Sequence, residues 1–313
     1  MTAVASRIRH FVSIGDLEAA ELDALLDLAA RLKADRSPRD DLAGKSVALI
    51  FEKPSLRTRL SFDVGVAQLG AHCVYLSPAE VGLGRRESVS DVARVVSRMA
   101  DAVVLRVNAH ETIEEFARYS HVPVINGLSD LSHPCQGLAD IFTIREQKGP
   151  DLHDVVVAYV GDGNNVAHSL MLCAAKTGAT LRIATPPGYE PLPRFRQLAD
   201  AAAKSSGGRI EIGNEPTAAV RGADVVYTDV WTSMGQEQEY ERRRRAFHGY
   251  QVNAQLMAQA KSDAIVLHDL PAHRGEEITD DVIDGPQSAV FDQAENRLHT
   301  EKALLCWLLG GAR

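Results

Sequence analysis

Apolar positions along the chain fall into short continuous runs that alternate with longer stretches of helical period. Val47–Phe51 is an apolar run that ends at a Pro-Ser turn, and residues 57–69 follow it with the spacing of a helix. A short apolar run followed by such a segment is typical of a β-strand that leads into a helix. The same alternation predicts further strands at 72–78, 101–107, 122–128, 155–160, 180–188, 223–231 and 263–271, and helices at 16–33, 88–99, 112–119, 133–148, 166–176, 192–204 and 294–309.

This alternation of strands and helices predicts an α/β fold of two domains, each a parallel sheet with helices on both faces. A Gly-Pro break at Gly149 and Pro150 separates the two series and places the domain boundary near residue 150. Polar clusters follow several of the predicted strands. Because open parallel sheets bind ligands at the carboxyl ends of their strands, we expect an enzyme whose site lies between the two domains.

Composition and charge narrow the function classes. Apolar residues make up 45% of the 313 residues and charged residues 24%, which excludes a disordered, collagen-like or disulfide-scaffold protein. The formal net charge of -8 argues against a nucleic-acid partner, since nucleic-acid binders are usually basic. The one basic run, Arg242–Arg245, lies in a polar stretch and is expected to be a solvated helix face.

The cysteines and the amino-terminal residues indicate in which cellular compartment the protein is expected. The 4 cysteines lie far apart and form no metal-spaced pair, so we expect neither a disulfide framework nor a zinc site. Cys135 and Cys173 are expected to be small core residues. The first residues contain no long apolar segment, and no stretch approaches the ~18 apolar residues of a membrane span. These features predict a soluble, cytoplasmic protein without a membrane partner.

One cluster at a predicted helix start could bind an anion. Ser55, Arg57, Thr58 and Arg59 follow a strand and open a helix, where hydroxyls, guanidinium groups and unpaired backbone N–H groups suit a phosphate. The other interpretation is a Ser N-cap followed by surface arginines, and spacing alone favours neither. No GxxxxGK[ST] motif is present, so this segment is not a nucleotide P-loop.

Two further clusters also begin predicted helices. His133 could donate to a carbonyl oxygen, with Gln136 one turn on, although a lone histidine is more often structural. Gly161–Asn165 follows a strand and suggests a dinucleotide site, but the third glycine of G-x-G-x-x-G is absent. The next strand also ends without a ribose-binding acid, so we expect no nicotinamide cofactor. The asparagine pair could instead hold a carboxylate.

Two late segments place charged side chains after strands. Asp229 ends a strand and Ser233 lies four residues on, an arrangement that suits an amino-acid zwitterion. A strand-end cap and turn is the other interpretation. Within residues 268–277, a Leu-Pro step restricts the backbone before a loop that can point carbonyl groups at a ligand. The His and Arg content of that loop is also compatible with a salt-bridged surface loop.

Taken together and in order, these segments resemble the aspartate/ornithine carbamoyltransferase family. The resemblance runs from Phe51 to Leu304 and is carried by SxRTR, HPxQ, DxWxSMGQE and LPAHRGEE in that order. The segment Asp229–Gly235 favours the ornithine-using members over the aspartate-using ones. The resemblance implies transfer of the carbamoyl group of carbamoyl phosphate to the δ-amine of ornithine, giving citrulline for arginine metabolism. It implies no cofactor and no metal.

The resemblance also implies a role for each motif residue. Residues 1–149 would bind carbamoyl phosphate, residues 150–292 would bind ornithine, and a C-terminal helix, 293–313, would return to the first domain. The carbamoyl phosphate set would be Ser55, the Leu56 backbone, Arg57, Thr58, Arg106, His133, Gln136, Arg297 and the backbone carbonyls of Asp269 and Leu270. The catalytic residues would be Arg106, His133, Gln136, Asp269 and Arg297. The ornithine set would be Asn165, Asp229, Ser233 and the Met234 backbone.

Members of the family are typically homotrimers in which a loop of the neighbouring chain completes the phosphate pocket. That loop often offers a glutamine. Here Gly82 stands at the corresponding place, with Arg85 or Arg86 as substitutes.

A second departure is Asp269, which stands where the ornithine enzymes have cysteine in His-Cys-Leu-Pro. An ionised carboxylate about 4 Å from the phosphate would repel it by roughly 4 kcal/mol at an effective dielectric near 20. It would also favour the ammonium form of the attacking amine, which cannot attack. The alternatives are therefore a carboxyl group that is turned away or protonated, transfer to another amine, a weakened enzyme, or a silent homologue that acts as a binding or regulatory subunit.

Overall fold

The computed structural model describes residues 8–233, 235 and 237–310, with the main chain only at residue 237. Two compact units make up the chain. The first unit comprises Met1–Leu17, Ala24–Cys135 and Arg297–Arg313, and the second comprises Glu18–Asp23 and Gln136–Asn296. Three helices have residues in both units, namely α1 (Ala19–Ala34), α6 (Pro134–Lys148) and α13 (Val290–Leu309).

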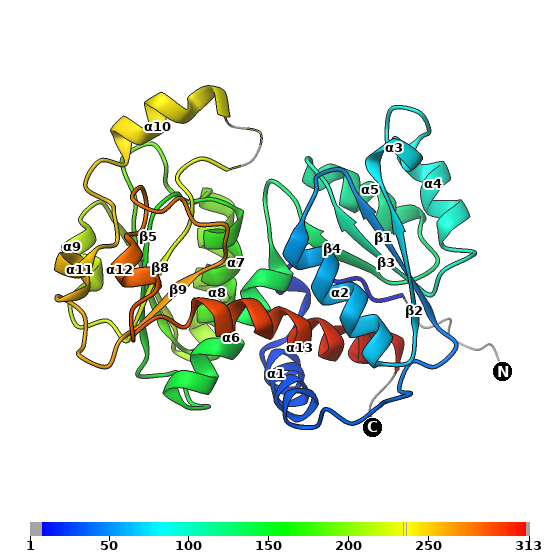
Figure 1. Ribbon diagram of the computed structural model, residues 1–313, viewed down its shortest axis with the longest axis horizontal. Helices are drawn as coiled ribbons and strands as arrows, with labels where there is room; N and C mark the ends of the chain where they lie inside the picture. Colours follow the sequence, from blue (N-terminus) through cyan, green and yellow to red (C-terminus); the bar gives the residue numbers. More distant parts are fainter. Residues whose placement is uncertain (1–7, 234, 236, 311–313) are drawn as a thin grey trace. The chain divides into compact units, whose positions relative to one another are not determined.

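The first unit is built around a four-stranded parallel sheet in the order β2-β1-β3-β4 (Figure 1). Parallel neighbours need crossover connections, which helices supply here. The elements are η1 (Ile14–Asp16), β1 (Ser46–Phe51), α2 (Leu56–Gln68), β2 (His72–Leu76), α3 (Pro78–Val81), α4 (Val89–Val96), β3 (Ala102–Arg106), α5 (His110–Tyr119) and β4 (Val124–Leu128).

Burial explains the apolar runs of this unit. All residues of β3 are buried, as expected for a strand covered on both faces of a parallel sheet. Val103 and Leu105 of β3 pack in one cluster with Val92 of α4 and Phe116 of α5. The two helices therefore cover the same face of the sheet, and the carboxyl end of β3 presents Arg106.

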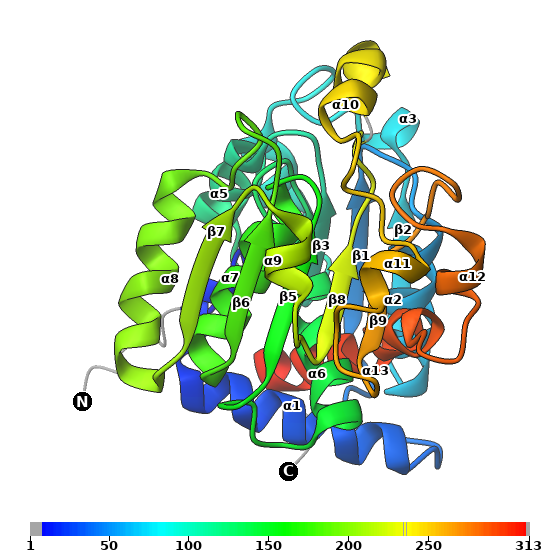
Figure 2. The same cartoon turned by 90° about the vertical axis from the view of Figure 1, so that its left-hand side faces the viewer.

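The second unit contains a five-stranded parallel sheet in the order β7-β6-β5-β8-β9 (Figure 2). The chain leaves β5 toward β6 on one side and returns to β8 on the other, so the carboxyl ends of β5 and β8 form a switch point, where such sheets bind ligands. The elements are β5 (Val156–Val160), α7 (Asn165–Thr177), β6 (Thr180–Ala184), α8 (Pro193–Ser206), β7 (Arg209–Gly213), α9 (Pro216–Val220), β8 (Val225–Thr228), η2 (Glu237–Glu239), α10 (Tyr240–Ala246), α11 (Ala254–Met257), β9 (Ile265–His268) and α12 (Asp280–Ile283).

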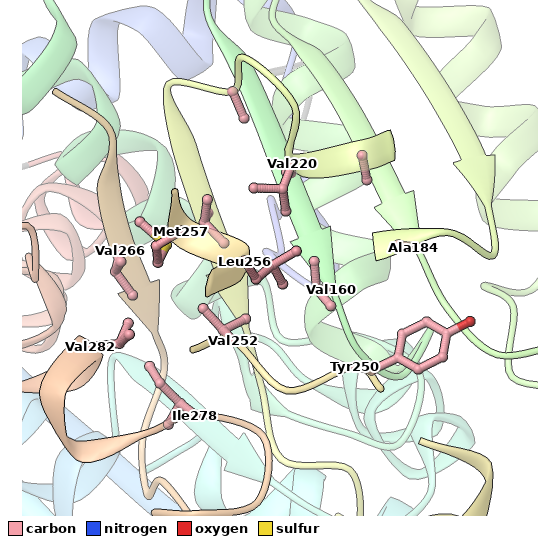
Figure 3. Close-up of a cluster of buried hydrophobic side chains, with 14 of the residues drawn as sticks. Val160, Ala184, Val220, Tyr250, Val252, Leu256, Met257, Val266, Ile278 and Val282 are labelled. Atoms are coloured by element: carbon pink, nitrogen blue, oxygen red, sulfur yellow. The ribbon is translucent and has the colours of Figure 1, made fainter. Parts of the chain in front are cut away.

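A cluster of buried apolar side chains packs on one face of this sheet (Figure 3). Ala158 and Val160 of β5 point into the cluster, where they meet Val220 of α9 and Leu256 of α11. Side chains alternate between the faces of a strand, so Tyr159 points to the opposite face. There its ring lies 5.5 Å from that of Tyr227.

The predicted α/β architecture is confirmed, with every predicted strand and helix present and end points that differ by a few residues. The C-terminal helix contacts the first unit, because α13 packs closely against α2. A Cβ atom on Gly65 would lie 3.2 Å from Lys302 and 3.4 Å from Leu298. The sequence pattern missed the edge strand β7 and the short helices α3, α9, α11 and α12. Within the described part of the chain, no helix is long and apolar enough to cross a membrane.

Candidate active site

The start of α2, in the first unit, carries groups that would suit an anion. Ser55 caps the helix, with the Thr58 N–H donating to its Oγ at 3.3 Å. Thr58 is buried, while Arg57 is half-buried. The 13-residue helix presents the positive end of its dipole here, and a helix start of this kind favours negative charge. The two interpretations of this segment therefore coexist, because Ser55 is an N-cap and the same turn also offers groups that suit a phosphate.

Arg297 of α13 joins this helix start. Its Nη2 donates to Thr58 Oγ1 at 3.2 Å, and its Nε and Nη2 donate to Glu301 Oε1 at 2.9 and 2.7 Å. Arg297 and Glu301 are both almost fully buried. Burial raises the pKa of Glu301 to about 7, against the opposing effect of Arg297. Glu301 therefore fixes the direction of the guanidinium, and the sequence could have indicated it as an acid four residues after Arg297.

His133 lies among three guanidinium groups. It is buried just before α6. Its pKa is held well below the usual value of 6.5, first by burial and then by the charges of Arg297, Arg106 and Arg57. The structure thus brings four predicted side chains together around one spot. Three guanidinium charges beside an imidazole whose pKa is lowered suit a phosphate and an adjacent carbonyl oxygen.

Gln136 lies one turn into α6, in the second unit. It is buried, and its amide Nε2 donates to Asp140 Oδ1 at 2.7 Å. Gln293 of α13 donates to the same oxygen at 2.6 Å. Asp140 therefore orients the amide of Gln136 through a buried network, and neither Asp140 nor Gln293 was predicted from the sequence.

In the second unit, the predicted ornithine residues surround the ends of β5 and β8. Asn164 caps α7, and its Nδ2 donates to Asp229 Oδ2 at 2.6 Å. Asn165 is the first residue of α7, Asp229 follows β8 directly, and Ser233 is half-buried in the next turn. Asn164 belongs to the asparagine pair noted in the sequence, and here its side chain caps the helix and binds Asp229. The predicted contribution of Met234 falls outside the described residues.

Asp269 lies close to Asp229, after β9. One ligand atom each from Asp229, His268 and Asp269 lies within 4.8 Å of the others, and Asp269 Oδ1 lies 3.5 Å from His268 Nδ1. The Leu270 N–H donates to His268 Nδ1 at 2.9 Å, so the ring proton is on Nε2, which faces Glu277 Oε1 at 3.1 Å. The Nδ1 atom of His268 therefore accepts from the backbone and does not donate to Asp269.

The backbone at Leu270 has an unusual conformation. Its φ is +58°, which side chains other than glycine seldom adopt, and the Leu270–Pro271 peptide is cis. A positive φ at a residue other than glycine is uncommon, and such residues concentrate at functional sites. This geometry fits the predicted role of the carbonyl groups of Asp269 and Leu270.

Two groups of described side chains have the geometry to hold a metal ion. One is the Asp229, His268 and Asp269 group, and the other is formed by His273, Glu276 and Glu277. The first coincides with the predicted amino-acid site, where the same carboxylates suit an ammonium group.

The arginine run on α10 is only partly exposed to solvent. The prediction of a solvated face is wrong for Arg243, which is buried, whereas Arg242, Arg244 and Arg245 are exposed. Gly82 could not be replaced by a larger residue without rearrangement. Its φ is +57°, and a Cβ atom at this position would lie only 2.7 Å from the Cβ atom of Arg86. The Arg86 Nη1 donates to Glu80 O at 2.6 Å.

Comparison with known proteins agrees with the two-part organisation. The family description "Aspartate/ornithine carbamoyltransferase, carbamoyl-P binding domain" matches residues 9–146, and the "Asp/Orn binding domain" of the same family matches residues 153–308. The chain is 56% identical over 306 residues to the ornithine carbamoyltransferase of Acidothermus cellulolyticus, covering 97% of this chain and 98% of the relative.

The chain is also similar to an archaeal relative and to a solved structure. The ornithine carbamoyltransferase of Thermococcus kodakarensis is 51% identical over 308 residues, covering 97% of this chain and 98% of that protein. The solved ornithine carbamoyltransferase of Pyrococcus furiosus superimposes with a TM-score of 0.94 at 50% identity, covering 99% of this chain and 100% of that one. The chain belongs to the aspartate/ornithine carbamoyltransferase family.

Proposed function

We propose that this protein is an ornithine carbamoyltransferase, which transfers the carbamoyl group of carbamoyl phosphate to the δ-amine of L-ornithine and releases L-citrulline and phosphate. The single observation that carries the proposal is the group of Arg57, Arg106 and Arg297, whose charges act together on the buried His133. Its relatives at about half identity over nearly the whole chain carry the same name. A role in arginine metabolism follows from the product.

Each group of the first unit has a defined task in this reaction. Arg57, with the N–H groups at the start of α2, binds the phosphate, and Arg106 bridges the phosphate and the carbamoyl oxygen. Neutral His133 and the hydroxyl of Thr58 donate to the same oxygen, where negative charge builds in the transition state. Arg297 adds its charge from a direction that Glu301 fixes.

The second unit holds the amino acid. Asp229 accepts from the α-ammonium group, and Asn165 and Ser233 donate to the α-carboxylate. We assign carbamoyl phosphate to residues 1–149, ornithine to residues 150–292 and the returning helix to residues 293–313. The backbone of Met234 and the amide of Gln136 complete the two proposed sets.

The reaction then needs no covalent intermediate. The neutral δ-amine attacks the carbamoyl carbon, the bond from that carbon to the phosphate oxygen breaks, and the amine loses a proton as phosphate leaves. Holding the two reactants side by side supplies much of the rate enhancement, and the preorganised donors supply the remainder.

Citrulline formation tests the proposal. Purified protein is incubated with carbamoyl phosphate and one of ornithine, N-acetylornithine, putrescine or aspartate, and the carbamoylated product is measured by mass spectrometry. We expect ornithine to give by far the highest kcat/KM, because Asp229 and Asn165 fit a free α-amino acid. Preference for another amine, or no product with any of them, would contradict the proposal.

We further propose a cytoplasmic homotrimer, with an interface along α2 and β2. Leu60 and Val64 of α2 are 57% and 36% exposed, and Val74 of β2 is 39% exposed. Exposed apolar side chains on neighbouring elements favour an interaction surface, and β2 is an edge strand of its sheet. Free, mostly buried cysteines support a reducing compartment.

Changing Leu60 to Glu is expected to dissociate this trimer, because it places a charge in an apolar interface. Analytical ultracentrifugation at micromolar concentration measures the result. Leu198→Glu, at an exposed leucine of α8 in the second unit, serves as the matched control and should leave the mass unchanged. An unchanged trimer in L60E, or a wild type that is monomeric, would rule out this interface.

A further inference from the structure

Arg243 is the one buried member of a basic run on α10. It is 7% exposed, whereas Arg242, Arg244 and Arg245 are exposed. A guanidinium carries five donors and is costly to bury without partners. The hydrogen-bond partners of Arg243 therefore show which parts of the chain its buried guanidinium holds together.

Those partners belong to two different loops. The Arg243 Nη1 donates to Asp162 Oδ2 at 2.8 Å and to the carbonyl oxygen of Trp231 at 3.1 Å. Asp162 lies in the loop after β5, three residues before Asn165. Trp231 lies in the loop after β8, between Asp229 and Ser233. One guanidinium nitrogen thus joins the two loops that carry the proposed ornithine contacts.

The same two loops are joined a second time by Asn164, whose Nδ2 donates to Asp229 Oδ2 at 2.6 Å. The Tyr159 hydroxyl donates to the carbonyl oxygen of Asp162 at 2.9 Å and so holds the loop after β5 to its own strand. On the loop after β8 the Arg243 link lies farther from the strand, at Trp231, and on the loop after β5 it lies at Asp162, two residues before Asn164. The backbone path from Asp229 to Ser233 is therefore tied at two points, and the outer tie depends on Arg243.

Neighbouring groups hold Arg243 in this position. Its Nε donates to Glu239 Oε2 at 3.0 Å, and its guanidinium lies 5.0 Å from the ring centroid of Tyr189. The rings of Tyr189 and Trp231 both pack against Phe247, at 4.9 and 5.9 Å between centroids. The side chain is thus preorganised before any substrate arrives.

We propose that Arg243 is a positioning residue for the amino-acid substrate, and that by tying the loop after β8 to the loop after β5 it sets the affinity for ornithine. The proposal rests on the function proposed above. It assigns Arg243 no contact with carbamoyl phosphate or with the reacting atoms.

The electrostatics of Asp162 agree with a tie of this kind. Burial raises the pKa of Asp162 to about 6, and the charge of Arg243 and its hydrogen bond oppose that rise, while Asp229 and Glu239 add to it. At neutral pH the carboxylate is thus ionised with Arg243 as its facing cation. Removing the guanidinium leaves a buried acid beside Asp229 and Glu239, which favours protonation of Asp162 and weakens its link to the loop after β8.

Steady-state kinetics test the proposal. In Arg243→Gln we expect the KM for ornithine to rise roughly tenfold or more, because remote groups that position a substrate have effects of this size. The kcat and the KM for carbamoyl phosphate should stay near the wild-type values. Arg243→Lys should recover part of the loss, and Arg244→Gln, at an exposed neighbour on the same helix, is the matched control without effect.

A second variant and an activity-independent readout guard against a folding defect. Asp162→Asn should show the same rise in ornithine KM, and the double variant should be no worse than either single one, as expected for one shared interaction. Hydrogen exchange of the protein alone should be faster across residues 229–233 in R243Q and D162N, but not in R244Q.

Two results would overturn the positioning role. One is an unchanged ornithine KM in R243Q and D162N, or a loss that falls on kcat or on carbamoyl phosphate instead. The other is unchanged exchange across residues 229–233. A wild type that forms no citrulline contradicts the proposed function separately, while the exchange experiment still decides whether Arg243 ties the loops.

Discussion

Replacing Arg106 with alanine is expected to lower the kcat/KM of citrulline formation by about 10³-fold. Loss of one preorganised oxyanion donor lowers kcat by roughly 10²- to 10³-fold. The R106A variant would also lose a charge-assisted hydrogen bond to the phosphate. The side chain is 5% exposed at the end of β3, and its charge faces His133. Steady-state kinetics with both substrates varied measures the loss.

Two further variants separate charge from geometry at this position. Arg106→Lys keeps the charge but loses the planar fork, so its kcat/KM should fall between those of the wild type and R106A. Arg118→Ala removes an exposed arginine from α5 in the same unit and should have no effect. If R106A retains kcat/KM near the wild-type value, the carbamoyl phosphate site has been placed wrongly.

Changing Asp269 to cysteine is expected to raise kcat/KM for ornithine by about tenfold or more, because in the proposed reaction a carboxylate near the phosphate would repel it and would favour the unreactive ammonium form of the amine. The side chain is 14% exposed and lies beside Asp229. His268 does not neutralise it, because its Nδ1 accepts the Leu270 N–H. The change is measured by steady-state kinetics from pH 6 to pH 9. The increase in kcat/KM of D269C over the wild type should be largest at pH 6, where most of the amine is in the ammonium form.

Asp269→Asn is the matched control for this prediction. It keeps the shape of the side chain and removes the charge, so it should share in the gain if repulsion is the cause. A D269C variant with unchanged or lower kcat/KM would show that the enzyme works with the carboxylate in place, and that the electrostatic argument is wrong.

Most of the fold could be predicted from the sequence because its strands are buried on both faces. A strand such as β3 reads as a continuous apolar run between polar turns. Strand β7 was missed because it lies at the edge of its sheet, where Arg209 and Glu211 are exposed and the run is broken. The helices α9, α11 and α12 have four or five residues, too few to show a helical period.

Part of the candidate site could likewise be predicted from the sequence, and part could not. The clusters after β1, β5 and β8 could be located because strand ends in a parallel sheet are where ligands bind. Arg297 could be placed only through the family resemblance, since its neighbours in space come from distant segments. The basic run on α10 gave no sign that Arg243 alone turns inward, because its partners Asp162 and Trp231 are contributed by other loops.

The most direct test of the central claim is a crystal structure with phosphonoacetamide, a stable analogue in which a methylene group replaces the bridging oxygen of carbamoyl phosphate. We predict that its phosphonate contacts the guanidinium of Arg57 and the N–H groups at the start of α2. Its carbonyl oxygen should lie within hydrogen-bonding distance of Arg106 and His133. An analogue bound elsewhere, or none bound at millimolar concentration, would contradict the account.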